Sequence, residues 1–257
     1  MIAGQATQIS RGNHDIRYDA LHDEFLVTSS EAILVFRGGA DGEEAPIRII
    51  QGPNTQMTSR YVERLDVDPV RNEIFVPAED RILVFRREAN GDVSPIRVIR
   101  GPDTRLTDPT VGRVGAIAID PVHELIVVGA DLNVKPAEGS GAMLIFNLTD
   151  NGNVKPRAAI QGSKTGILDT DQIQIYPPKS WIVATQSGTA GLESEGAFVG
   201  VWSINDNGDV PPRWKIMGPK SMMRKPRGVA LNPKYKELIV ADMGLSMVLT
   251  YYFPEIF

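Results

Sequence analysis

Apolar and polar residues alternate along many short stretches of this chain. In residues 64–68, 116–120 and 172–176 every second residue is apolar, which is the period of a strand with one buried face. Each stretch leads through a turn into a β-branched run such as 73–76 and a further apolar run such as 82–85. No segment keeps a 3.6-residue apolar period over three turns. The pattern therefore predicts an all-β fold.

The groups of strands form a repeat. After the third strand comes a polar turn with Asn-Gly or Asp-Gly, whose residues supply the positive φ angles of tight hairpins. A fourth strand that begins with proline, such as 95–99, then leads into a copy of the motif G-x-x-[TS]-x-[ILM]. The copies begin at Gly4, Gly52, Gly101, Gly162 and Gly218. Four short strands in a unit of about fifty residues are typical of a β-propeller blade.

The number of copies predicts a five-bladed β-propeller that forms one domain over residues 1–257. The last unit stops after its third strand, 247–252, and lacks a full outer strand. Residues 1–3 stand in the position of an outer strand, so we expect them to pair with 247–252 and close the ring. The alternative is a six-bladed parent protein of which this chain is a part.

Composition narrows the classes of partner. Lys and Arg number 27 against 32 Asp and Glu, giving a formal charge of −5 without a basic run, so we expect no nucleic-acid partner. The absence of cysteine excludes disulfides and thiolate metal sites. No apolar stretch is long enough to span a membrane, so we expect a soluble monomer, with an edge-mediated dimer as the alternative. The chain shows no signal peptide and leaves its compartment open; a longer parent would be secreted or periplasmic.

The last unit resembles an NHL repeat. Its residues 225–242 contain the pattern P-x-G-[IV]-A, followed by a strand that ends in V-A-D. Earlier units match more loosely, since Thr28 and Thr185 stand where the pattern has that aspartate. The resemblance implies a propeller. NHL-like propellers include binding scaffolds, lyases and, more distantly, gluconolactonase-type metal-dependent hydrolases, so the resemblance implies several functions.

Polar residues on the innermost strands are the candidate ligand-binding site. The repeat places the following residues around the mouth of the central channel: His14, Arg17, Glu63, Arg64, Asp66, Asp171, Gln172, Gln174 and Arg227. This mixed ring would suit a polar or anionic small molecule, and Glu63, Asp171 and His14 are candidate ligands of a divalent cation. The alternative is a solvated channel in which the charges pair with one another.

Two long loops are predicted on one face of the propeller. The connection between the second and third strands is longer in the third and fourth units, where it includes residues 129–142 and 185–196. Long loops on a rigid scaffold are common binding elements, although surface loops also lengthen at little cost. We therefore expect a binding rim on the face that carries these loops.

Catalytic motifs for serine hydrolases, nucleotide-binding enzymes and zinc proteases do not occur in the chain. The sequence favours a noncatalytic binding or scaffold module that recognises a protein, peptide or glycan. The alternative is a metal-assisted lactonase or lyase that acts at the channel mouth. No cofactor is expected for the first function, and a divalent cation would accompany the second.

Overall fold

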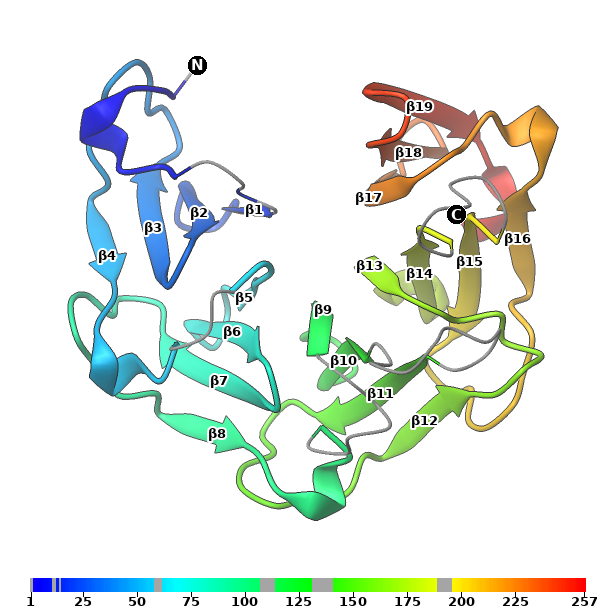
Figure 1. Ribbon diagram of the computed structural model, residues 1–257, viewed down its shortest axis with the longest axis horizontal. Coiled ribbons are helices and arrows are strands. Elements are labelled where there is room, and N and C mark those ends of the chain that lie inside the picture. The colour runs from blue at the N-terminus through cyan, green and yellow to red at the C-terminus, as the bar shows by residue number, and fades with distance from the viewer. Residues whose placement is uncertain are drawn as a thin grey trace.

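Five antiparallel sheets, one for each sequence repeat, give the arrangement of a five-bladed β-propeller (Figure 1). The computed structural model describes residues 2–10, 13, 15–57, 62–106, 114–130, 141–188 and 196–257. Within these residues the first four blades have four strands each and the fifth has three. The all-β prediction and the count of five blades are confirmed.

Each blade is built from consecutive strands in chain order, and the strands have the following bounds. Blade 1 contains β1 (Ile16–Asp19), β2 (Glu24–Ser29), β3 (Ala32–Arg37) and β4 (Arg48–Ile50). Blade 2 contains β5 (Asp66–Asp68), β6 (Glu73–Ala78), β7 (Arg81–Arg86) and β8 (Arg97–Ile99). Blade 3 contains β9 (Val114–Asp120), β10 (Leu125–Ala130), β11 (Ala142–Asn147) and β12 (Ala158–Gln161). Blade 4 contains β13 (Thr170–Tyr176), β14 (Trp181–Gln186), β15 (Phe198–Ser203) and β16 (Trp214–Met217). Blade 5 contains β17 (Pro226–Asn232), β18 (Glu237–Asp242) and β19 (Met247–Tyr252).

The hydrophobic core lies between neighbouring blades. The second and third strands of blades 1 to 4 are apolar on both faces, so each of these sheets needs cover on two sides. Four buried clusters supply that cover, one between each pair of successive blades. Trp202 is buried in the cluster between blades 3 and 4.

The recurring motif G-x-x-[TS]-x-[ILM] is a compact turn between blades. In η3 (Pro102–Thr104) the Thr104 hydroxyl donates to the Gly101 carbonyl at 2.6 Å and accepts from the Leu106 amide at 3.1 Å. Gly101 has φ 137°, a conformation that favours glycine, and Leu106 is buried. The hydroxyl residue is thus required by the turn, and the final apolar residue anchors the turn in the core.

The Asn-Gly turns join neighbouring blades. Gly91 and Gly152 have the positive φ angles that the sequence predicted, 78° and 73°. In addition, the side chain of Asn90 in blade 2 accepts a hydrogen bond from the Ile49 amide of β4 at 3.0 Å, and Asn151 accepts from Val98 of β8 in the same way. Each outer strand is therefore held by the turn of the following blade as well as by its own sheet.

The expected closure by residues 1–3 is wrong for the residues that the structure describes. Ile2 forms a parallel bridge with Gly42, and the Ala3 amide donates to the Gly42 carbonyl at 2.9 Å. Ile50 and Ile99 make the same bridge to the turns of blades 2 and 3. Ile2 therefore occupies the place that the end of a preceding outer strand would take, and it does not pair with β19.

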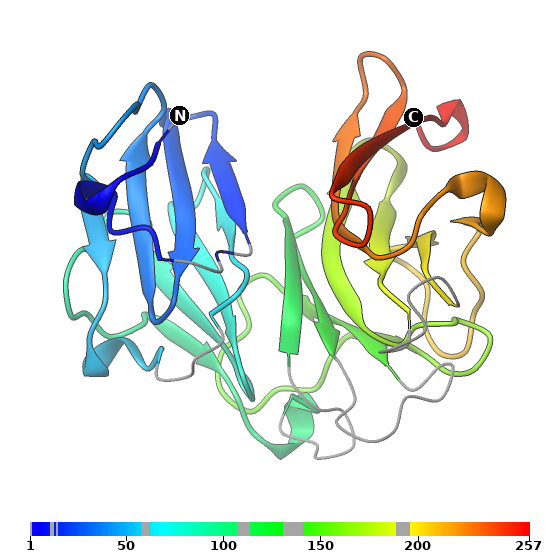
Figure 2. The ribbon, with the colours of Figure 1, turned by 45° about the horizontal axis from the view of Figure 1, so that its top comes forward.

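The arc of blades is open between blade 1 and blade 5 (Figures 1 and 2). Among the described residues β19 pairs with β18 alone. The residues after β19, including η6 (Pro254–Ile256), turn back over blade 4, where Phe253 and Phe257 pack beside Trp214 and Tyr176. The outer edge of β19 and the two end faces of the arc are thus left without a neighbouring sheet in the described chain.

The turn motif predicts a specific effect of a buried substitution. Thr104→Val keeps the shape of the side chain but leaves the Gly101 carbonyl and the Leu106 amide without their partner. We expect a loss of about 1–3 kcal/mol in the free energy of unfolding, measured by denaturant titration. Thr104→Ser keeps both hydrogen bonds and is expected to lose clearly less; equal losses in the two variants would contradict this role of the hydroxyl.

Candidate functional site

The innermost strands bring polar side chains to the centre of the propeller. The strand pairing places residues of the five repeats at two equivalent positions. One position holds Asp15, Arg64, Ala116, Gln172 and Gly228, and the other holds Arg17, Asp66, Ala118, Gln174 and Ala230. At these two positions blades 1, 2 and 4 therefore supply polar groups, while blades 3 and 5 supply small residues that leave room for them.

Arg17 links two carboxylates of neighbouring blades. Its Nε donates to the Leu65 carbonyl at 3.0 Å and lies 3.4 Å from Asp66 Oδ1, and its Nη2 lies 3.6 Å from Asp15 Oδ2. Burial raises the pKa of Asp15 and of Asp66 above the usual value, and the Arg17 charge opposes that rise. The guanidinium thus offsets part of the cost of burying the two carboxyl groups.

Asp171 lies between two arginines. Arg227 Nη1 is 2.5 Å from Asp171 Oδ1, and Arg64 Nε donates to the Asp171 carbonyl at 2.9 Å. Burial raises the pKa of Asp171 to about 7, and the neighbouring Asp169 adds to the rise, while Arg227, a hydrogen bond from Ser187 and Arg64 oppose it. Asp171 is therefore a carboxyl group that titrates near neutral pH in the folded protein.

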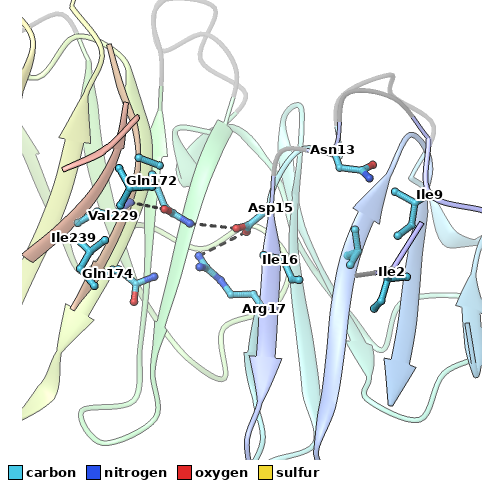
Figure 3. Close-up of a pocket in the computed structure, with 15 residues that line it drawn as sticks. Ile2, Ile9, Asn13, Asp15, Ile16, Arg17, Gln172, Gln174, Val229 and Ile239 are labelled. Atoms are coloured by element: carbon cyan, nitrogen blue, oxygen red, sulfur yellow. Dashed lines mark hydrogen bonds and ion pairs between the residues drawn. The ribbon is translucent and has the colours of Figure 1, made fainter. Parts of the chain in front are cut away.

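Gln172 crosses the centre and connects blades 1, 4 and 5. Its Nε2 donates to Asp15 Oδ1 at 3.2 Å, and its Oε1 accepts from the Val229 amide at 2.6 Å (Figure 3). The backbone amide of Gln172 donates to the Thr185 hydroxyl at 3.0 Å. One amide side chain therefore ties the two ends of the arc to the middle of the propeller.

A groove of about 720 Å³ lies between blade 1 and blade 5, above this network. Figure 3 shows Asp15, Arg17 and Gln172 meeting at its centre. The walls are mainly apolar and consist of Ile2, Ile9, Ile16 and Val27 on one side and Val229, Ala230, Ile239, Ala241 and Val248 on the other. The structure therefore provides an apolar groove with a polar floor at the open side of the arc.

The sequence-predicted site residues divide into two groups. Arg17, Gln172 and Gln174 line the groove, and the remaining described members lie in the central network or beside it. Glu63 belongs to the second group, and its carbonyl accepts from the Thr28 hydroxyl at 3.2 Å. His14 lies outside the described residues, as do 131–140 and 189–195 of the two long loops. The proposed loop rim is therefore not tested by this structure.

Sequence reasoning missed Asp15 and the apolar walls of the groove. The repeat carried a signal for Asp15, because Asp15 stands at the position of Arg64 and Gln172, which were both selected. The apolar walls carried no separate signal, since Ile16 and Val248 occupy positions that packing fills in the other blades. Only the open arrangement of the blades distinguishes these residues from ordinary core.

The described residues contain no group of three or more His, Cys, Asp or Glu side chains arranged to hold a metal ion. Likewise, no helix within the described parts of the chain is both long and apolar enough to cross a membrane.

Comparisons of the chain with models of known protein families and with curated protein sequences gave no match.

The raised pKa of Asp171 predicts how stability changes with pH. The carboxyl group of an unfolded chain ionises near 3.8, whereas in the folded protein Asp171 keeps its proton up to about 7. Between these values the unfolded state binds fewer protons, so the contribution of Asp171 to stability falls as pH rises. Asp171→Asn lacks this titration.

We therefore expect the unfolding free energy of Asp171→Asn, relative to the wild type, to rise between pH 4 and 7 and to level off above pH 8. The rise has an upper limit of roughly 4 kcal/mol, because a pKa difference of one corresponds to about 1.4 kcal/mol. Urea titrations at a series of pH values measure it. A relative stability that is constant with pH would show that Asp171 titrates normally.

Proposed function

We propose that this chain is a noncatalytic binding module that holds a protein or peptide ligand in the groove between blades 1 and 5. The observation that carries the proposal is the exposure of one apolar side chain on each wall of the groove, Val248 and Ile16. Val248 of β19 is 67% exposed, whereas the residues at the same position in the other blades are at most 1% exposed. Those residues are Ile33, Ile82, Met143 and Val199.

The opposite wall of the groove shows the same difference. Ile16 of β1 is 57% exposed, and the equivalent residues of the other blades, Leu65, Ile117, Ile173 and Val229, are at most 4% exposed. Exposed apolar surface on both sides of one groove is typical of a binding site for a protein segment. The apolar walls favour a polypeptide over a glycan, which would need many polar groups.

The state of the central charges also supports binding rather than catalysis. Arg17, Arg64 and Arg227 all contact carboxylates or backbone carbonyls of other blades. These groups therefore have a structural task, which is to join the inner strands. The polar floor formed by Arg17 and Gln172 would orient a ligand, while the apolar walls would supply most of the binding energy.

We place the chain among NHL-like propellers as part of the same proposal. Support comes from Asp242, the last residue of the V-A-D pattern, whose side chain is buried and accepts from the amides of Arg224, Lys225 and Leu245 at 2.7–3.1 Å. The aspartate accepts hydrogen bonds from the backbone before β17 and after β18. The motif therefore has a structural role, which does not indicate a particular function.

A metal-assisted lactonase or lyase is the second candidate. Its one favourable feature is the pKa of Asp171 near 7, since groups that titrate there serve as general acids or bases. It ranks second because the Asp171 side chain is nearly fully buried and paired with Arg227. A divalent cation that stabilised the wild type but not Asp171→Asn would favour this candidate.

Selection from a displayed library of random peptides tests the binding function. We expect peptides that bind the wild type and bind at least tenfold more weakly to the double variant Ile16→Asp with Val248→Asp, because charges on both walls oppose an apolar ligand. Val122→Asp is the matched control, since Val122 is 71% exposed and lies outside the groove residues. Peptides that bind the double variant as well as the wild type would contradict the proposal.

A further inference from the structure

The outer edge of β19 lacks a partner strand among the described residues. In each of the other blades the third strand pairs with a short outer strand, as β3 does with β4 and β7 with β8. In the described chain β19 has no such partner, and the C-terminal residues pack on blade 4 instead. A bare strand edge accepts another strand through its free backbone groups.

The repeat specifies what kind of strand fits this edge. The outer strands of blades 1 to 4 all begin two residues after a proline and contain isoleucine at the fifth position of the pattern P-x-x-x-I. The four segments are Pro46 to Ile50, Pro95 to Ile99, Pro156 to Ile160 and Pro212 to Ile216. The isoleucine pairs with the third-strand residue that corresponds to Val248. An apolar residue is therefore expected opposite Val248.

Two residues of each blade vary together from blade to blade. One is the third residue of the pattern P-x-x-x-I on the outer strand, and the other is the first residue of the second strand. In blades 1 and 2 a glutamate faces an arginine: Arg48 binds both carboxylate oxygens of Glu24 at 2.7 and 2.9 Å, and Arg97 binds those of Glu73 at 2.6 and 2.8 Å. The other two blades replace both partners at once.

Blade 3 has Leu125 and Ala158 at these two positions, within one apolar cluster. Blade 4 has Trp181 and Trp214, whose rings pack edge to face with centroids 5.2 Å apart. The residue on the second strand therefore indicates its partner on the outer strand.

Blade 5 has Glu237 at this position. Among the described residues its hydrogen-bond partner is the Asn232 side chain, at 2.9 Å, in place of the arginine that blades 1 and 2 supply. By the rule of the other four blades, the strand that completes blade 5 carries arginine at its third position.

We propose that blade 5 is completed by an extended segment of a protein partner with the pattern Pro-x-Arg-x-Ile. The segment pairs antiparallel with β19, its arginine lies opposite Thr250 and binds Glu237, and its isoleucine lies opposite Val248. This inference rests on the proposed function, because it names the class of partner that occupies the same side of the arc. The segments of this chain with the matching pattern are already the outer strands of their own blades.

A labelled peptide with the sequence of residues 92–101, which contains the outer strand of blade 2, tests the proposal. We expect it to bind the wild type in fluorescence anisotropy and to slow amide exchange in β19. Glu237→Gln should weaken binding at least tenfold, whereas Glu31→Gln, which changes an exposed glutamate away from β19, should leave it unchanged. The R97E form of the peptide should bind the wild type at least tenfold more weakly and recover on Glu237→Arg.

A second form of the experiment detects the strand even if it binds weakly. The same ten residues are joined after Phe257 through a flexible glycine-serine linker, which raises their effective concentration to the millimolar range. The fused strand should raise the melting temperature, and its R97E form should not. No effect of either form, or equal effects of the two sequences, overturns the proposal. Dimerisation through β19 without peptide binding also overturns it, in favour of a second copy.

Library peptides that bind the groove but lack the arginine and leave β19 unprotected would overturn this inference and leave the proposed function standing. If every library peptide bound the wild type and the variant Ile16→Asp with Val248→Asp equally well, the proposed function would be wrong. Binding of the strand peptide in the pattern described above would then stand as an independent result.

Discussion

Every blade of this protein depends on a neighbour to cover its sheet. The second and third strands of blades 1 to 4 are apolar on both faces, and burying such faces is the main favourable contribution to folding. Four clusters between successive blades satisfy this requirement. The arc has two ends, however. Among the described residues, Ile2 and Ile9 pack on the apolar cluster of blade 1 together with side chains of that blade, whereas no sheet covers the end face of blade 5. The proposed binding site follows from this constraint.

The polar centre complements the apolar blade interfaces. Arg17, Arg64 and Gln172 reach from one inner strand to the backbone or carboxylate of another, so they fix how the inner strands lie around the axis. Such contacts between buried groups are unfavourable unless each charge has a partner. The raised pKa of Asp171 shows that its partners only partly offset the cost of its burial.

Much of the fold could be predicted from the sequence because it is written in local patterns. Alternation with a period of two, Asn-Gly turns and a repeated glycine motif each report the geometry of a few neighbouring residues. Ile2 shows the limit of this reasoning. Its position in the repeat was correct, but its partner is Gly42 of the same blade, because the relation between chain ends depends on how all five blades assemble.

The candidate site was harder to predict for the same reason. Arg17, Asp66 and Asp171 were selected from their repeat positions, yet the ion pairs they form join different blades and cannot be read from spacing. Ile16 and Val248 look like ordinary core residues in the sequence, and only their exposure marks them as a surface for a ligand. His14 and most of the two long loops lie outside the described residues, so their role stays a prediction.

The central claim is that the end face of blade 5 is open, and hydroxyl-radical footprinting of the free protein is its most direct test. Tyr252 lies on the same face of β19 as Val248 and is 73% exposed, and Tyr235 in a turn of the same blade is 57% exposed, whereas Phe146, on the third strand of blade 3, is fully buried. The account predicts that Tyr252 is oxidised about as fast as Tyr235 and at least tenfold faster than Phe146. Protection of Tyr252 to the level of Phe146 in the monomeric protein would show that this face is already covered, and would contradict the account.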